Sequence, residues 1–72
     1  MTQDILTKHI ELNTFLKVVC IANTGGMAKL IIRSGKVKVN AEVETRNKRK
    51  LHEGDTVEFD GKKYIVDEKL LR

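Results

Sequence analysis

Lysine and arginine side chains are concentrated in the middle of the sequence. Between positions 29 and 50 there are eight basic residues against two acidic ones, whereas the rest of the chain has six basic and eight acidic residues. Such a cluster suits a polyanion, because each cation can neutralise a phosphate and an arginine can hold one with two N–H groups. Charge alone favours a solvated lysine-rich surface over a binding site, so the arrangement of the cations has to decide. The eight basic residues are Lys29, Arg33, Lys36, Lys38, Arg46, Lys48, Arg49 and Lys50.

Other reactive side chains are scattered. Cys20 lies in an apolar stretch with no histidine near it in the sequence, so we expect a buried apolar residue rather than a nucleophile. His9 and His52 are far apart, and Asp67 and Glu68 match no paired-carboxylate site. The sequence therefore predicts no enzyme, no metal site, no cofactor and no small-molecule substrate.

The aromatic side chains do not suggest a stacking surface. Phe15 falls on the apolar face of a predicted helix, and Phe59 is also expected in the core. Tyr64 is expected to be partly exposed, but one tyrosine does not make a platform for single-stranded bases. A nucleic-acid partner would therefore be recognised by its shape and backbone.

The composition predicts one small domain over residues 1–72. A hydrophobic share of 40% is ordinary for a globular chain, and a lone cysteine cannot form an internal disulfide, so apolar packing has to supply the stability. The first residues lack the regions of a signal peptide, and no apolar run approaches the length of a membrane span. We expect a cytoplasmic monomer with no membrane partner.

Apolar spacing predicts an extended segment and a first helix. Residues 3–11 fit an extended lead. Leu12, Phe15, Leu16 and Val19 then recur at helical spacing, which predicts a helix over residues 14–22 with Asn13 as its N-cap.

A second helix is predicted from a cap at Thr24 to about position 34, where Gly35 ends it. Lys29 and Arg33 are four residues apart and project together from its polar face. The apolar face of this helix consists of Ala28, Ile31 and Ile32.

After the second helix the period changes to two, which is typical of strands. Val37, Val39 and Val43 are expected to point to the same side, with a tight turn at Asn40-Ala41. Residues 45–50 then form a basic loop, after which Leu51 returns to the core.

The C-terminal part of the chain predicts one more hairpin. Asp60-Gly61 is a two-residue turn signal between strands at residues 56–59 and 63–66, and residues 67–72 form a frayed or short helical tail. The fold class is α+β.

In this order the elements resemble the S4 RNA-binding domain, also called the αL motif. The match covers about residues 12–59. The residues that carry it are Leu12 and Leu16, Ala28 and Ile32, Gly35-Lys36-Val37-Lys38-Val39-Asn40, and Gly54-Asp55. Two further segments, Thr24-Gly25-Gly26 and Val43-Glu44-Thr45-Arg46, are similar to small stand-alone bacterial S4-like proteins, the YbcJ/YaaA group. The resemblance implies a two-helix hairpin packed on a small, bent antiparallel sheet, preceded by an extended segment. It also implies non-catalytic binding of structured RNA, such as ribosomal RNA or the ribosome.

One departure from the S4 pattern falls at the start of the second helix. S4 domains usually have a Ser-Arg pair there, and that arginine commonly meets RNA, whereas this chain has Thr24-Gly25. Thr24 keeps the cap. Gly25 and Gly26 could expose helix N-terminal amides to a phosphate, or could simply make a tight turn between the helices.

Two other partners fit a basic S4-like surface. The missing arginine at Gly25 is compatible with a protein-interaction adaptor whose basic surface meets an acidic protein. Positive charge would also attract a DNA duplex. Pull-downs that survive ribonuclease would favour the adaptor, and competition between matched RNA and DNA duplexes would separate the two nucleic acids.

Overall fold

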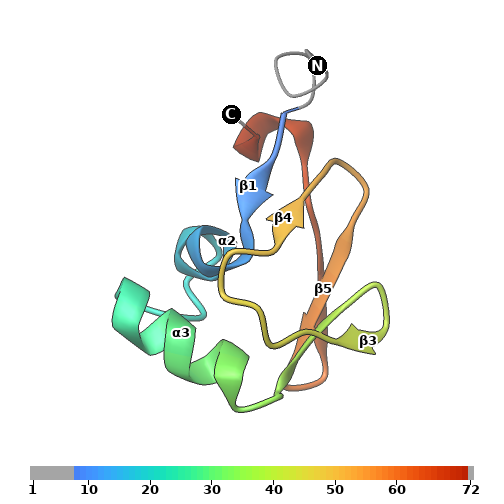
Figure 1. Cartoon of the computed structure of the whole chain (residues 1–72). Helices are drawn as coiled ribbons and strands as arrows, with labels where there is room; N and C mark the ends of the chain where they lie inside the picture. Colours follow the sequence, from blue (N-terminus) through green and yellow to red (C-terminus); the bar gives the residue numbers. More distant parts are fainter. Residues whose placement is uncertain (1–7, 72) are drawn as a thin grey trace.

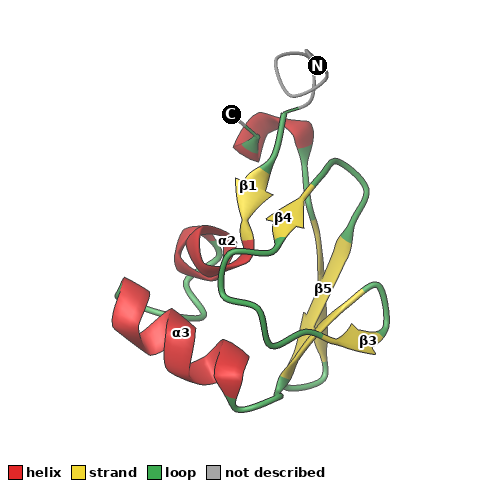
Figure 2. Cartoon of the chain, viewed as in Figure 1, coloured by secondary structure: helices red, strands yellow, loops and turns green. Residues whose placement is uncertain are grey.

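Two short helices lie beside two small antiparallel sheets in the computed structural model, which describes residues 8–71 (Figure 1, Figure 2). In chain order the elements are β1 (Ile10–Glu11), α2 (Leu12–Val18), α3 (Gly25–Arg33), β2 (Val37–Val39), β3 (Glu42–Val43), β4 (Lys50–Leu51), β5 (Thr56–Phe59), β6 (Lys62–Ile65) and the 3₁₀ turn η1 (Glu68–Leu70). One sheet pairs β1 with β4, and the other has the order β3-β2-β5-β6. The predicted α+β class is confirmed.

The extended lead ends in strand β1. Ile10 pairs with Leu51 and Glu11 pairs with Lys50, so β1 lies antiparallel to β4. The rest of the predicted lead, residues 3–7, lies outside the described residues.

Helix α2 begins earlier than predicted because its first amides find partners in another loop. The N–H of Leu12 donates to the carbonyl of Arg49 (2.8 Å), and the N–H of Asn13 donates to the carbonyl of Asn47 (3.1 Å). First-turn N–H groups have no partner within their own helix, and here the loop before β4 supplies the acceptors. Asn13 is therefore the second residue of α2 and not its N-cap, and its side chain accepts a bond from the N–H of Thr14 (2.8 Å).

Helix α2 also ends earlier than predicted, at Val18. Cys20 has a left-handed backbone (φ 64°). Its N–H donates to the carbonyl of Lys17 (3.1 Å) and the N–H of Ile21 donates to the carbonyl of Leu16 (2.9 Å), the two bonds of a Schellman motif. The predicted burial of Cys20 is wrong, since its side chain is exposed. Apolar neighbours in the sequence do not bury a residue that lies in the turn after the helix.

Helix α3 has the predicted cap, position and faces. Thr24 is its N-cap, and the Thr24 hydroxyl accepts a bond from the third N–H of the helix (3.1 Å). Ala28 and Ile32 are fully buried, whereas Lys29 and Arg33 are exposed.

The turn between β2 and β3 reverses the predicted orientation of one valine. Both residues of Asn40-Ala41 have positive φ (52° and 72°), as a type I′ turn requires. Val39 pairs with Glu42 and Lys38 pairs with Val43, and directly paired residues share a face of the sheet. Val43 therefore lies on the face of Lys38 and is 57% exposed, whereas Val37 and Val39 are buried, so the prediction that the three valines point to the same side is wrong.

Side chains link this turn to the turn before β5. The Asn40 amide donates to Oδ1 of Asp55 (3.2 Å), and the N–H of Thr56 donates to Oδ1 of Asn40 (3.1 Å). The second carboxylate oxygen of Asp55 accepts a bond from the N–H of His52 (2.8 Å). Asn40 and Asp55, both part of the S4 pattern, thus have a structural role.

The second hairpin forms at Asp60-Gly61 as predicted, with φ of 54° and 76°. β6 starts at Lys62, one residue earlier than expected, and the buried Val66 follows it. The predicted tail contains η1, which Asp67 caps, and residue 72 lies outside the described residues.

The core lies between the helices and the inner face of the four-stranded sheet. Its largest fully buried side chains include Phe15 and Leu51, as predicted. Phe59, which was expected in the core, is only half-buried and packs against it, whereas Tyr64 is partly exposed as predicted. In the part of the chain that the structure describes, none of the helices is long and apolar enough to cross a membrane.

Candidate functional site

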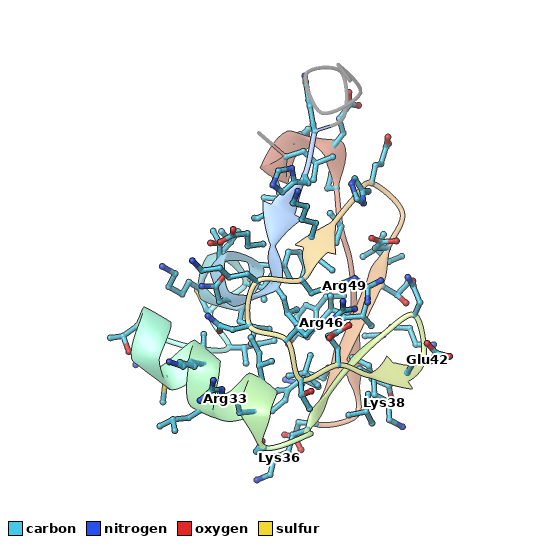
Figure 3. All side chains as sticks on the ribbon, in the orientation of Figure 1. Arg33, Lys36, Lys38, Glu42, Arg46 and Arg49 are labelled. Carbon is cyan, nitrogen blue, oxygen red and sulfur yellow. The ribbon has the colours of Figure 1, made fainter. Side chains whose placement is uncertain are left out.

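The loop between β3 and β4, together with the first residue of β4, gathers four of the predicted cations around one open hollow of about 440 Å³. We call it the basic hollow, and its lining residues are Arg46, Lys48, Arg49 and Lys50. All four carry positive charge at neutral pH, so the hollow suits an anionic group. Figure 3 shows Arg46 and Arg49 next to each other in the middle of the view.

A buried carboxylate holds the two arginines of the basic hollow. Glu44 Oε2 accepts bonds from the backbone N–H (3.0 Å) and Nε (2.8 Å) of Arg46, and Oε1 accepts from Nη2 of Arg46 (3.2 Å) and Nη1 of Arg49 (2.5 Å). Two parallel bonds from one guanidinium fix its plane as well as its position. Hydrogen bonds from Arg46, followed by those from Arg49, lower the pKa of Glu44 to about 2 although burial opposes this, so Glu44 is ionised at neutral pH. The same carboxylate raises the pKa of Arg46.

The arginines remain available to a ligand. Only 8% of the Glu44 side chain is exposed, against 73% for Arg46 and 31% for Arg49. A guanidinium has five N–H donors, and Glu44 uses two of those of Arg46 and one of those of Arg49. The remaining donors belong to guanidinium groups whose orientation is already set.

The backbone of this loop is anchored on both sides. The N–H of Glu44 donates to the carbonyl of Val37 in β2 (2.9 Å). Further along the loop, the carbonyls of Asn47 and Arg49 accept the first two amides of α2. The basic hollow therefore has a fixed frame formed by the sheet and a helix end.

Two other predicted cations lie elsewhere. Lys36 and Lys38 line a second open hollow of about 580 Å³, together with Gly35, Phe59 and Asp60. Within residues 8–71 the two hollows share no lining residue. The second hollow also contains a carboxylate, which lowers its attraction for anions.

The cations of α3 form a third group. Lys29 and Arg33 are exposed, and neither is among the described residues that line the two hollows. Figure 3 shows Arg33 on α3 and Lys36 where the chain leaves that helix, while Lys38 lies toward β3. The predicted basic segment is thus divided into three groups, and the group at residues 46–50 lines a hollow whose described lining contains cations alone.

The conformation and packing at the start of α3 do not account for the glycines at positions 25 and 26. Among the described residues, a Cβ added to Gly25 would meet no atom within 4 Å, and one added to Gly26 would come no nearer than 3.9 Å to the Thr24 hydroxyl. Neither glycine has a positive φ. Neither the turn nor its packing therefore requires glycine there, and a phosphate contact at Thr24, Gly25 and Gly26 stays a prediction.

The remaining reactive side chains of residues 8–71 do not assemble into a metal site. The rings of His9 and His52 lie 6.3 Å apart, centroid to centroid; His9 directly precedes β1 and His52 directly follows the neighbouring strand β4. Within residues 8–71, no group of three histidine, cysteine or carboxylate side chains is placed to hold a metal ion.

The sequence alone does not predict that Glu44 binds both arginines. In the sequence it is one of two acids among the eight bases of residues 29–50. The available signal was a single carboxylate two residues before Arg46 and five before Arg49, but that spacing brings the groups together only because the loop turns back.

Comparison with known proteins agrees with the fold and with the resemblance drawn from the sequence. The family model described as S4 domain matches residues 4–67. A Bacillus subtilis (strain 168) protein named "Probable ribosome maturation protein RlbA" is 44% identical over 55 residues, which cover 76% of this chain and 78% of that protein. An Escherichia coli (strain K12) protein named "Putative RNA-binding protein YbcJ" is 43% identical over 53 residues, which cover 74% of this chain and 76% of that protein. Matched over most of its length by the family model and by these relatives, the chain belongs to the S4 domain family.

Proposed function

We propose that this protein binds structured RNA without catalysing a reaction, and that ribosomal RNA in the cytoplasm is its target. The names of two relatives, one a ribosome maturation protein and the other an RNA-binding protein, support this partner. The observation that supports the proposal most strongly is the basic hollow, where four cations line one concave surface. Phosphates supply most of the affinity in such complexes, and the lack of a stacking platform favours folded or double-stranded RNA.

We propose that the predicted cations outside the basic hollow contact further phosphates of the same RNA. They are Lys29 and Arg33 on α3, and Lys36 and Lys38 at and before β2. The start of α3, at Thr24, Gly25 and Gly26, is a further predicted phosphate contact. We place the main contact at the hollow because its described lining contains cations alone.

Binding of a labelled RNA stem-loop at low ionic strength tests the proposal. Lys48→Glu combined with Lys50→Glu should weaken binding by at least about tenfold, because two attractive contacts become repulsive. These lysines are chosen because the arginines also pair with Glu44.

The matched control combines Lys62→Glu with Lys63→Glu. These two exposed lysines lie on β6, outside the described lining of both hollows, and the total charge changes equally. The control should lose much less affinity. Equal losses would show that only net charge matters, and a wild-type protein without salt-sensitive RNA binding would refute the proposed function. An association in cells that resists ribonuclease would instead favour an acidic protein partner.

A further inference from the structure

The basic hollow contains a carboxylate, which a surface that only attracts polyanions does not need. Glu44 lies beneath Arg46 and Arg49 and removes one unit from the positive charge of the site. Long-range attraction depends on that net charge. A carboxylate in this position therefore weakens attraction, and any benefit to ligand binding must come from geometry.

The geometry offers such a benefit. A mobile arginine loses side-chain freedom when it binds a phosphate, and this loss opposes binding. Glu44 has already restricted both guanidinium groups, and its own N–H is tied to Val37 in the sheet. Lys48 and Lys50, by contrast, are point charges on flexible stems with little directional preference.

We infer that Glu44 is a positioning residue that presets Arg46 and Arg49 so that the basic hollow discriminates an A-form RNA duplex from a B-form DNA duplex. This inference rests on the proposed function, since it specifies how the same hollow selects its ligand. Fixed N–H donors match phosphates with one particular spacing and direction, and A-form and B-form duplexes differ in the spacing and the direction of their phosphates. The lysines attract either duplex.

The experiment compares Glu44→Gln with Glu42→Gln. Both changes remove one negative charge from neighbouring positions, but Glu42 is exposed on β3, whereas Glu44 lies beneath the arginines. The probes are a short RNA duplex and a DNA duplex of the same sequence, each titrated at one salt concentration. Circular dichroism identifies a temperature at which every variant is folded.

Glu44→Gln should reduce the ratio of RNA affinity to DNA affinity by about tenfold, as expected when oriented charge-assisted bonds are lost. Its affinity for DNA should stay the same or rise, because the site becomes more positive. Glu42→Gln should leave the ratio unchanged. A carboxylate that only stabilises the fold would not change this ratio in a folded protein.

Arg46→Lys provides an independent variant, because it keeps the charge and loses the two-pronged geometry. It should lower the same ratio, and adding Glu44→Gln should lower it little further. Parallel changes in RNA and DNA binding in both Glu44→Gln and Arg46→Lys would overturn the inference, as would a wild-type protein that binds both duplexes equally. A wild-type protein that binds no RNA would instead refute the proposed function.

Discussion

Glu44 shows how a single residue can change the meaning of a charge pattern. In the sequence it is one of two acids among eight bases. In the fold its carboxylate accepts four hydrogen bonds from Arg46 and Arg49. An ionised carboxylate with these partners stabilises the folded chain as well as the site.

Replacing Glu44 should change how stability depends on pH. The pKa of Glu44 falls from its ordinary value of 4.5 to about 2 in the folded protein, so its contribution is complete above pH 4.5 and disappears as the pH falls toward 2. Glu44→Gln should lower the free energy of unfolding at pH 7 by about 1–3 kcal/mol, with the lower end favoured because solvent screens the exposed Arg46. Near pH 2 this difference should shrink toward zero. Urea unfolding at both pH values measures it.

Glu42→Gln is the control for this measurement. Glu42 is exposed, and its removal should change stability little at either pH. If Glu44→Gln keeps the same stability deficit from pH 7 to pH 2, the ion pairs do not stabilise the fold in the way described.

Cys20 is a second residue whose surroundings differ from those that its sequence neighbours predict. Its apolar neighbours predict burial, yet its left-handed backbone places it in the Schellman turn that ends α2. Glycine is the usual residue at this position, and no glycine marks the turn in this sequence. The helix end was therefore missed, and the orientation of the cysteine with it.

At the scale of elements, two turns far apart in the sequence depend on each other. Asn40 in the β2–β3 turn bonds to Asp55 and to the N–H of Thr56 at the start of β5. Asn40→Gly keeps access to positive φ while removing these bonds, and Asp55→Ala removes the other partner. A double-mutant cycle followed by urea unfolding should give a coupling of about 1 kcal/mol.

Asp60 supplies the control for this cycle. It occupies the β5–β6 turn with a positive φ of its own, and Asp60→Gly should combine additively with Asp55→Ala. Additive effects of Asn40→Gly and Asp55→Ala would contradict the proposed link between the two turns.

At the scale of the whole molecule, the cations fall into three groups with different surroundings. The basic hollow has a wholly cationic described lining, the hollow at Lys36 and Lys38 includes Asp60, and α3 carries Lys29 and Arg33 on its exposed face. The sequence pattern allows these cations to converge on one surface. The fold instead predicts unequal contributions to phosphate binding.

The dependence of RNA affinity on salt should reveal this inequality. Lys48→Ala should reduce the slope of log affinity against log salt by about one, the value expected for one lost phosphate contact. Lys29→Ala, which removes the same type of side chain from α3, should reduce it by clearly less. Affinity titrations over several salt concentrations provide the slopes, and equal reductions would show that α3 belongs to the contact surface as fully as the loop does.

The sequence by itself determined the features that depend on nearby residues. The cap at Thr24 and the helical spacing that follows predicted α3, and the residue types at Asn40-Ala41 and Asp60-Gly61 predicted both hairpin turns. The predicted burial of Phe15 and Leu51 is likewise confirmed. Each is controlled by backbone conformations or apolar periods that a few neighbouring residues specify.

Only the tertiary structure decided the features that need distant partners or a particular loop path. Helix α2 begins at Leu12 because Arg49 and Asn47 accept its first amides, and the register of β3 on β2 turns Val43 outward. Glu44 faces two arginines because the loop turns back over a carboxylate that the sheet holds in place. Local propensities do not predict such contacts between distant residues, because these contacts depend on which segments the core brings together. Here the packing of those segments shapes the basic hollow.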